Sequence, residues 1–224
     1  MRNFHTIEKT RYVIGIDEVG RGALCGSVTV AAFVFLRNAA LPSHAEGTPL
    51  RDSKRLTPRA RGKWFRAVKE AARTGEMAFA TARVAPHVVD RVNIRNAANL
   101  AATRAYERLV AKTRLSPSSL TVLLDGGLFI RPRERFVPRA ARTMVRGDEK
   151  IPEIQLASIV AKVTRDRAMV RLHARYPSYG FAAHKGYGTL FHRRALRAHG
   201  PIKGRHRLTF ISFLSDRRVG ARKQ

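Results

Sequence analysis

The stretch YVIGIDEVGRGALCGSVTVAAFVF, residues 12–35, determines the expected fold. It contains an apolar run, Tyr12–Ile16, that ends at the acidic pair Asp17-Glu18. A second apolar run, Ser27–Phe35, follows a connection rich in glycine and is itself rich in β-branched residues. Runs of this length and composition, separated by a glycine-punctuated turn, are typical of neighbouring buried strands. We therefore predict two buried strands joined by a tight connection.

Outside this stretch, the hydrophobic pattern predicts helices and further strands. Thr57-Pro58 is a favourable helix start, because threonine caps the first turn and proline fits its first position. Residues 93–113 and 152–175 place apolar side chains at helical spacing. Strands are expected at 77–84, 121–124 and 143–145, helices at 58–74 and around 189–198, and a surface loop at 37–50. This order indicates an α/β or α+β mixed sheet with helices packed on it.

The charge balance points to an anionic partner. The chain has 224 residues, with 44 Lys and Arg against 16 Asp and Glu and a formal net charge of +28 at pH 7. A surface this positive suits nucleic acid, an anionic membrane face or an acidic protein. Because the positive residues are spread along the chain, a single amphipathic membrane anchor is the least attractive of the three. With 44% hydrophobic residues the chain can still bury a sizeable core, so one domain is expected.

Cys25 is the single cysteine, which excludes an intramolecular disulfide and a cysteine-based zinc site. We expect this thiol to fill a small apolar slot, and the low cysteine content fits a reducing compartment. No apolar run approaches the roughly 20 residues of a membrane span, and the first ten residues lack the apolar centre of a signal peptide. We therefore expect a cytoplasmic protein that binds no membrane.

Acidic residues are scarce, which makes the positions of four of them informative. Those four fall at predicted strand ends beside glycines: Asp17, Glu18, Asp125 and Asp148. Ligand sites of open sheets gather at strand ends, and carboxylates that meet there repel one another unless a cation lies between them. Oxygen ligands without cysteine or histidine favour Mg²⁺ or Mn²⁺, ions that assist phosphodiester hydrolysis. The alternative is that Asp125 and Asp148 simply form turns, since Asp-Gly is a common turn dipeptide.

The glycines after Asp17-Glu18 bear on this site. Adjacent strand residues point to opposite faces, so both acids reach one cation only if the strand ends or bulges there. Gly20 and Gly22 permit such a break. The segment Gly20-Arg21-Gly22 can also present backbone amides and a guanidinium to a sugar-phosphate backbone, and a simple tight turn is its alternative.

Several ordered motifs resemble bacterial ribonuclease HII, from about Tyr12 to Phe210. They are GIDEVGRG (15–22), RDSKRL (51–56), VNIRNA (92–97), LLDGG (123–127), VRGD (145–148), ASIVAKVTRD (157–166) and YGFAAHKGYGT (179–189). The resemblance implies an α/β fold with an RNase H-like mixed five-stranded sheet flanked by helices and a C-terminal helical extension. It implies one catalytic domain at 1–212, which includes the extension from about 178 to 212, and a basic flexible tail at 213–224.

The activity implied by this resemblance is that of a ribonuclease H. Such an enzyme hydrolyses the RNA strand of RNA·DNA hybrids and nicks duplex DNA on the 5′ side of single embedded ribonucleotides, leaving 5′-phosphate and 3′-hydroxyl ends. Its partners would be RNA·DNA hybrids and DNA duplexes that contain ribonucleotides, and we expect a monomer. Two divalent ions, Mg²⁺ or Mn²⁺, would flank the scissile phosphate, one activating the attacking water and the other stabilising the leaving oxygen.

The resemblance also implies roles for individual residues. The family's catalytic, metal-binding carboxylates match Asp17, Glu18, Asp125 and Asp148. The residues that sense the 2′-hydroxyl, the group that distinguishes RNA from DNA, match Gly20, Arg21, Gly22 and Tyr187. The phosphate contacts match Ser53 and Lys54, and the contact to the strand opposite the cut matches Asn93.

Other polar residues receive a structural interpretation, and other functions stay open. Asp166 lies on the helical stripe of Ile159 and Val163, so we interpret it as a paired structural acid and as the main rival of Asp148 for the fourth metal ligand. Four histidines lack metal-ligand spacing and are expected at the surface or facing phosphates: His184, His192, His199 and His206. The alternative functions are a non-catalytic basic nucleic-acid-binding protein on the same fold, ribonuclease HIII, and a transposase-like nuclease. The GRG string and the lack of room for an extra N-terminal domain favour ribonuclease HII over ribonuclease HIII.

Overall fold

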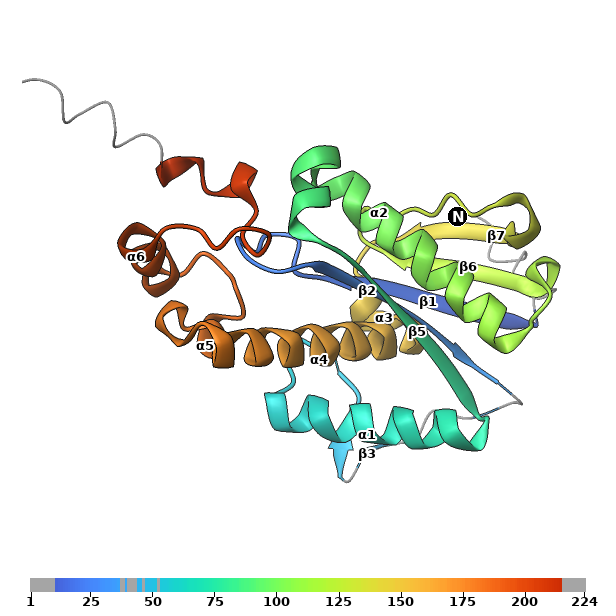
Figure 1. Cartoon of the computed structure of the whole chain (residues 1–224). Coiled ribbons are helices and arrows are strands. Elements are labelled where there is room, and N and C mark those ends of the chain that lie inside the picture. Colours follow the sequence, from blue (N-terminus) through green and yellow to red (C-terminus); the bar gives the residue numbers. More distant parts are fainter. Residues whose placement is uncertain (1–10, 37–38, 40–43, 46, 52, 215–224) are drawn as a thin grey trace, which may run out of the picture.

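A mixed five-stranded sheet forms the centre of the molecule (Figure 1). The computed structural model describes residues 11–36, 39, 44–45, 47–51 and 53–214. The strands are β1 Tyr12–Val19, β2 Val28–Phe35, β5 Met77–Val84, β6 Leu120–Asp125 and β7 Ala140–Met144. They lie in the order β5-β2-β1-β6-β7. The β5, β2 and β1 strands pair antiparallel, whereas β1, β6 and β7 are parallel, so the predicted mixed sheet is confirmed.

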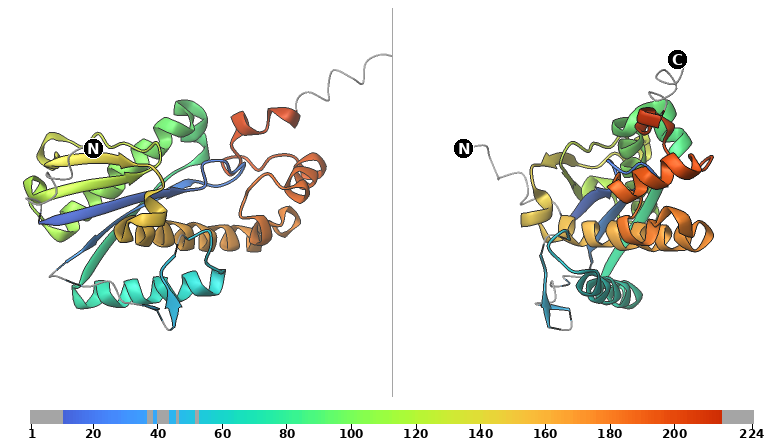
Figure 2. Two further views of the ribbon diagram at one scale, coloured as in Figure 1. Left: turned by 180° about the vertical axis from the view of Figure 1, so that it is seen from behind. Right: turned by 90° about the vertical axis from the view of Figure 1, so that its left-hand side faces the viewer.

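Helices cover both faces of this sheet (Figure 2). The helices are α1 Pro58–Thr74, α2 Pro86–Thr113, α3 Gly147–Lys150, α4 Pro152–Arg175, α5 Phe181–His184 and α6 Leu190–His199. α2 lies on one face, and α4 lies on the other with α1 packed beside it. α1 begins as predicted, because Thr57 Oγ1 accepts a hydrogen bond from the amide of Ala60 at 3.2 Å. Among the described helices, none combines the length and the apolar character that a transmembrane span requires.

A glycine in the middle of β1 sets the distance between the sheet and α4. Ile14 and Ile16 point into the core under α2, so Gly15 faces α4. A Cβ atom on Gly15 would lie 2.2 Å from the carbonyl carbon of Glu153 and 2.4 Å from the amide nitrogen of Ile154. The first turn of α4 therefore rests directly on the backbone of β1. This contact holds the start of α4, and α3 just before it, beside the acidic end of the strand.

The first turns of α2 were not predicted. The expected helix began at Asn93, but the helical segment begins at Pro86 and is interrupted at Asn93, whose φ is 63° and ψ is 166°. The side chain of Asn93 accepts a hydrogen bond from the amide of Asn96 at 3.0 Å and so caps the second part of the helix. Pro86 does end β5 as predicted, but it also occupies the first position of the next helix.

Two further predictions, one of a loop and one of a strand, differ from the structure. The segment 37–50, predicted as a loop, contains a short antiparallel pair, β3 (His44–Ala45) with β4 (Thr48–Pro49). Strands of two residues carry no recognisable hydrophobic pattern. β7 begins at Ala140, before the predicted start at Thr143, because it is an edge strand whose middle residues are exposed.

The residues after α4 form the predicted helical extension at one end of the sheet. Their core includes Cys25, which is fully buried, so the predicted apolar slot for this thiol is confirmed. The expectation of surface histidines is wrong for His192 and His206, which are 0% and 2% exposed and lie 3.1 Å apart through their Nε2 atoms. Each is held by a backbone group, which offsets the loss of water. Residues 215–224 of the predicted tail lie outside the described residues.

Candidate active site

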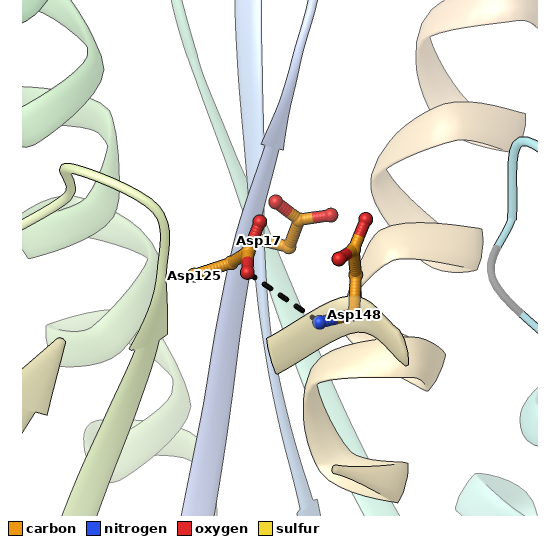
Figure 3. Close-up of side chains that lie close together, drawn as sticks. All are labelled: Asp17, Asp125 and Asp148. Atoms are coloured by element: carbon orange, nitrogen blue, oxygen red, sulfur yellow. Dashed lines mark hydrogen bonds between the residues drawn. The ribbon is translucent and has the colours of Figure 1, made fainter. Parts of the chain in front are cut away.

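Three carboxylates meet at the ends of the three parallel strands (Figure 3). Asp17 lies on β1, Asp125 is the last residue of β6, and Asp148 lies in α3, which follows β7. Each contributes a carboxylate oxygen, and these oxygens all lie within 4.8 Å of one another. We call these three residues the carboxylate cluster. Because β1, β6 and β7 are adjacent and parallel, the sheet itself brings together acids that are far apart in sequence.

Hydrogen bonds from the backbone and from a serine fix these carboxylates. Oδ1 of Asp125 accepts hydrogen bonds from the amides of Gly147 at 2.7 Å and Asp148 at 3.4 Å, which ties β6 to the start of α3. Oδ1 of Asp17 accepts one from the amide of Glu18 at 2.7 Å. The side chain of Ser158, on α4, also hydrogen-bonds Asp17. The carboxylates of Asp17 and Asp125 are therefore held in place before any ligand binds.

The electrostatics of the cluster favour a bound cation. Asp17 is 4% exposed, and burial together with the neighbouring Glu18 and Asp125 raises its pKa well above the usual value. Burial and the nearby Asp148 likewise raise the pKa of Asp125. Among the described residues, an ion pair joins Oδ2 of Asp148 in the cluster to Nζ of Lys54, at 2.8 Å. Clustered hard oxygen ligands with this unrelieved repulsion fit a divalent ion such as Mg²⁺ or Mn²⁺.

Glu18, the fourth predicted carboxylate, is not a member of the cluster. β1 does not break at Asp17 but continues to Val19, so Glu18 points to the other side of the strand. Its Oε1 accepts a hydrogen bond from Nη1 of Arg21 at 3.3 Å. Its Oε2 is buried without a hydrogen-bond partner among the described residues, and burial raises the pKa of the group. An orphaned carboxylate oxygen beside the cluster is a further place for a cation or a bound water.

A cavity of about 590 Å³ adjoins the cluster, and Asp17, Glu18 and Asp125 line it. Most of the predicted substrate residues line the same cavity: Gly20, Arg21, Gly22, Ser53, Lys54 and Tyr187. Asn93 is absent from this lining, and its side chain caps α2 instead. The cavity also contains residues that the sequence reasoning did not single out: Arg61, Ser158 and Lys162. Ser158 and Lys162 are four residues apart on α4, a spacing that places them on one helix face.

The predicted substrate residues differ in how the structure uses them. Ser53 is 3% exposed, and its hydroxyl lies 2.7 Å from that of Ser158, so it supports the serine that contacts Asp17. The ring of Tyr187 lies near two cations, 5.3 Å from Cζ of Arg165 and 6.0 Å from Nζ of Lys162. The backbone of Tyr187 forms a β-bridge with Ala23. The tyrosine thus lies directly beside the loop of residues 20–26, which we call the glycine-rich loop.

Asp166 is excluded from the cluster by its own partners. Its carboxylate pairs with Nζ of Lys162 at 3.0 Å and with Nη2 of Arg61 at 4.0 Å. The interpretation of Asp166 as a paired structural acid is therefore confirmed. Asp148, and not Asp166, lies with Asp17 and Asp125.

Comparison with known proteins shows that this chain is similar to nucleases. The model of the family described as Ribonuclease HII matches residues 14–213. The ribonuclease H2 from Pyrococcus horikoshii OT3 has a similar structure, with 22% identity and a TM-score of 0.67 over 92% of this chain and 98% of that chain. RNase HII from Archaeoglobus fulgidus, solved in complex with PCNA, has 22% identity and a TM-score of 0.62 over 95% and 97% of the two chains.

A third solved structure extends this likeness. Bst-RNase HIII in complex with Mn²⁺ has 20% identity and a TM-score of 0.69 over 98% of this chain and 74% of that chain. At such identities, the similarity to these three structures establishes a shared fold. The match to the family model covers most of the chain, so it shows family membership in addition to the fold.

Proposed function

This chain belongs to the ribonuclease HII family and is a ribonuclease H; on that premise we propose that it cuts RNA·DNA hybrids and nicks DNA duplexes on the 5′ side of single embedded ribonucleotides. The cuts would leave 5′-phosphate and 3′-hydroxyl ends. The observation that carries this proposal is the carboxylate cluster at the edge of a cavity lined by the glycine-rich loop and Tyr187. We place the reaction in the cytoplasm and expect the enzyme to act as a monomer.

Asp17, Asp125 and Asp148 would hold the divalent ions, with Glu18 completing the ligand set from the side of the cavity. The donors are all hard oxygens, and the unpartnered Oε2 of Glu18 and the raised pKa of Asp17 both fit a missing positive charge. When bound there, Mg²⁺ or Mn²⁺ activates water and stabilises charge on the phosphate. The Mn²⁺ complex of the structurally similar Bst-RNase HIII supports the choice of metal.

The remaining residues of the cavity would bind and orient the nucleic acid. Arg21, Lys54 and Lys162 bring positive charge to the cavity, where phosphates would lie. Because phosphate contacts release counterions, the affinity should fall steeply as salt increases. Gly20 and Gly22 allow the backbone to approach a sugar closely, and Tyr187 offers a ring for stacking and a hydroxyl for hydrogen bonding. These contacts would read the 2′-hydroxyl of the ribonucleotide.

Incubation with three labelled duplexes tests the proposal. One contains a single ribonucleotide, one is a full RNA·DNA hybrid, and one contains no ribonucleotide. We expect cleavage of the first two, only with Mg²⁺ or Mn²⁺ present, and no cleavage of the third. Binding of all three without cleavage would instead support the non-catalytic alternative.

Two variants connect the reaction to the site. Asp17→Asn should abolish cleavage while it keeps or improves duplex binding, because it removes a buried negative charge near the phosphates. Glu70→Gln is the control, since Glu70 is an exposed acid of α1 that lies outside both the cluster and the cavity. Tyr187→Ala should reduce cleavage at a lone ribonucleotide more than it reduces binding. Undiminished turnover by Asp17→Asn would refute the assigned site.

A further inference from the structure

Two arginines beside the candidate site are buried, although they form no salt bridge with a carboxylate among the described residues. Arg165 is 1% exposed and Arg207 is 0% exposed. A buried charge normally requires a counter-ion, because desolvation of an unpaired ion is costly. Here backbone carbonyl groups take that place. The segments that supply those carbonyls carry the glycine-rich loop and Tyr187.

The buried guanidinium of Arg207 donates hydrogen bonds to several carbonyl groups of the glycine-rich loop. Its Nη1 donates a hydrogen bond to the carbonyl of Arg21 at 2.7 Å, and its Nη2 donates to the carbonyls of Gly20 at 2.7 Å and Gly26 at 2.9 Å. Its Nε also donates to Gly26, at 3.1 Å. The backbone amide of Arg207 donates to the carbonyl of Leu24 at 2.8 Å. The loop from residue 20 to residue 26 is thus closed around one side chain.

These bonds orient the amide groups of the loop. In a trans peptide the N–H points opposite to the carbonyl. Because Arg207 attracts the carbonyls of Gly20 and Arg21, the N–H groups of Arg21 and Gly22 point away from it. Within the described part of the chain, no protein acceptor binds either of these two N–H groups. Both residues line the cavity, so two backbone donors are available to a ligand oxygen there.

Arg165 joins the same loop to the segment of Tyr187. Its guanidinium donates to the carbonyls of Cys25 at 3.1 Å, Ser27 at 3.2 Å and Lys185 at 2.8 Å. A Cβ atom on Gly20, whose φ is 89°, would lie 2.2 Å from Nε of Arg165, so only glycine fits against it. The two arginines together fix both substrate-facing segments relative to each other.

A lysine in place of Arg207 could not form this set of hydrogen bonds. A guanidinium offers five donors in a planar fork, whereas an ammonium is a compact point charge. Burial lowers the pKa of Arg207 to about 10, so the group stays charged at neutral pH and keeps all its donors. The fork geometry determines which carbonyls turn inward and therefore which amides turn outward.

We propose that Arg207 is a positioning residue for ribonucleotide recognition, which holds the amides of Arg21 and Gly22 toward the sugar of the substrate, with Arg165 fixing the opposite side. The inference rests on the proposed function, because it requires the glycine-rich loop to contact the ribonucleotide. It adds that the last part of the fold, and not β1 alone, sets the shape of that loop.

Steady-state kinetics of Arg207→Lys on the single-ribonucleotide duplex and on the full hybrid test this role. Misplaced recognition groups typically cost up to about a hundredfold in rate, so we expect kcat on the single ribonucleotide to fall by about tenfold or more. The loss on the full hybrid should be smaller, because its neighbouring ribonucleotides offer further 2′-hydroxyls for contact, whereas the other duplex offers only one. Arg205→Lys, an exposed arginine two residues away, is the matched control and should behave as the wild type.

Two further measurements separate positioning from loss of folding. Mg²⁺ that binds the folded protein should raise its Tm. This rise should persist in Arg207→Lys, because the carboxylate cluster does not contact Arg207. Duplex binding without divalent ions should also persist. If Arg207→Lys does not fold, Arg165→Lys provides the same test from the other side of the loop. Equal losses on both substrates would overturn the inference, whereas a wild-type protein that cleaves neither substrate would overturn the proposed function itself.

Discussion

The ammonium nitrogen of Lys54 lies 2.8 Å from Oδ2 of Asp148, so the protein places one of its own cations against the carboxylate cluster. The side chain of Lys54 is 75% exposed, whereas that of Asp148 is 5% exposed. The lysine therefore reaches the cluster from the solvent side. It can move toward a phosphate when another cation takes over the neutralisation of Asp148.

Lys54→Gln should therefore strengthen Mg²⁺ binding in the absence of nucleic acid. Exposed ion pairs contribute up to about 1 kcal/mol, which corresponds to a Kd for Mg²⁺ lower by at most about fivefold. The Kd is measured by calorimetric titration. Lys69→Gln, which removes the same charge from an exposed position of α1, is the control and should leave the Kd unchanged. Weaker Mg²⁺ binding by Lys54→Gln would show that the two cations do not compete.

Removal of the Asp17 charge should stabilise the metal-free protein. The folded pKa of Asp17 is raised, so its ionisation destabilises the folded state as the pH rises above the usual value for aspartate. At pH 8 in a chelator, Asp17→Asn should therefore raise Tm, by about 2–4 °C for each kcal/mol relieved. Added Mg²⁺ should raise the Tm of the wild type and not that of the variant. A lower Tm for Asp17→Asn in chelator would contradict the unrelieved repulsion.

The buried histidine pair predicts a loss of stability in acid. The amide of Ile202 donates to Nδ1 of His206, so His206 carries its proton on Nε2 and donates it to His192. His192 then donates from Nδ1 to the carbonyl of Tyr187 at 2.9 Å. Both rings are neutral in this arrangement, and burial lowers the pKa of each to about 4.

Protonation in the unfolded chain begins near pH 6.5, so the contribution of these histidines to stability falls as the pH decreases from about 6.5 to about 4. The loss is on the order of 3 kcal/mol for each ring. Urea unfolding across this range should show a weaker pH dependence for His206→Asn than for the wild type. His199→Asn, an exposed histidine on α6, should keep the wild-type slope. Identical slopes in wild type and His206→Asn would disprove the coupling.

Gly15→Ala should disturb the contact between β1 and α4. The added methyl group would meet the backbone of Glu153 and Ile154, which cannot move as a flexible side chain would. Overpacking of this kind costs about 1–3 kcal/mol in the free energy of unfolding. Gly127→Ala is the control, because no atom lies within 4 Å of a Cβ there. Chemical denaturation of the two variants gives the comparison, and equal stability would contradict a close contact at Gly15.

The central sheet could be predicted from sequence because β1 and β2 are buried runs whose pattern is visible locally. β7 was placed too late, since its exposed middle residues carry no such pattern. The acids were informative because they are few, and three of the four do meet. Glu18 lies outside the cluster because β1 continues past Asp17 to Val19. The sequence could not show this, since Gly20 and Gly22 are compatible with a strand that ends at Asp17 and with one that ends later.

The roles of Arg165 and Arg207 could not be predicted. The chain has 44 Lys and Arg residues, so the default expectation for any one arginine is an exposed position on a charged surface. Burial of Arg207 results from contacts with residues almost the whole chain away, and no local pattern reports them. His192 and His206 were misjudged for the same reason, because their partners are each other and the backbone of the same extension.

The bond between Arg207 and the carbonyl of Gly20 joins residues 187 positions apart. A ribosome releases Gly20 early in translation and Arg207 only near the end. The strands and the carboxylate cluster of a nascent chain are therefore synthesised before Arg207 is available to bind the loop of residues 20–26. If Arg207 positions the recognition loop as we propose, selectivity for the ribonucleotide depends on the last part of the chain to be synthesised, and a product of interrupted translation would lack it.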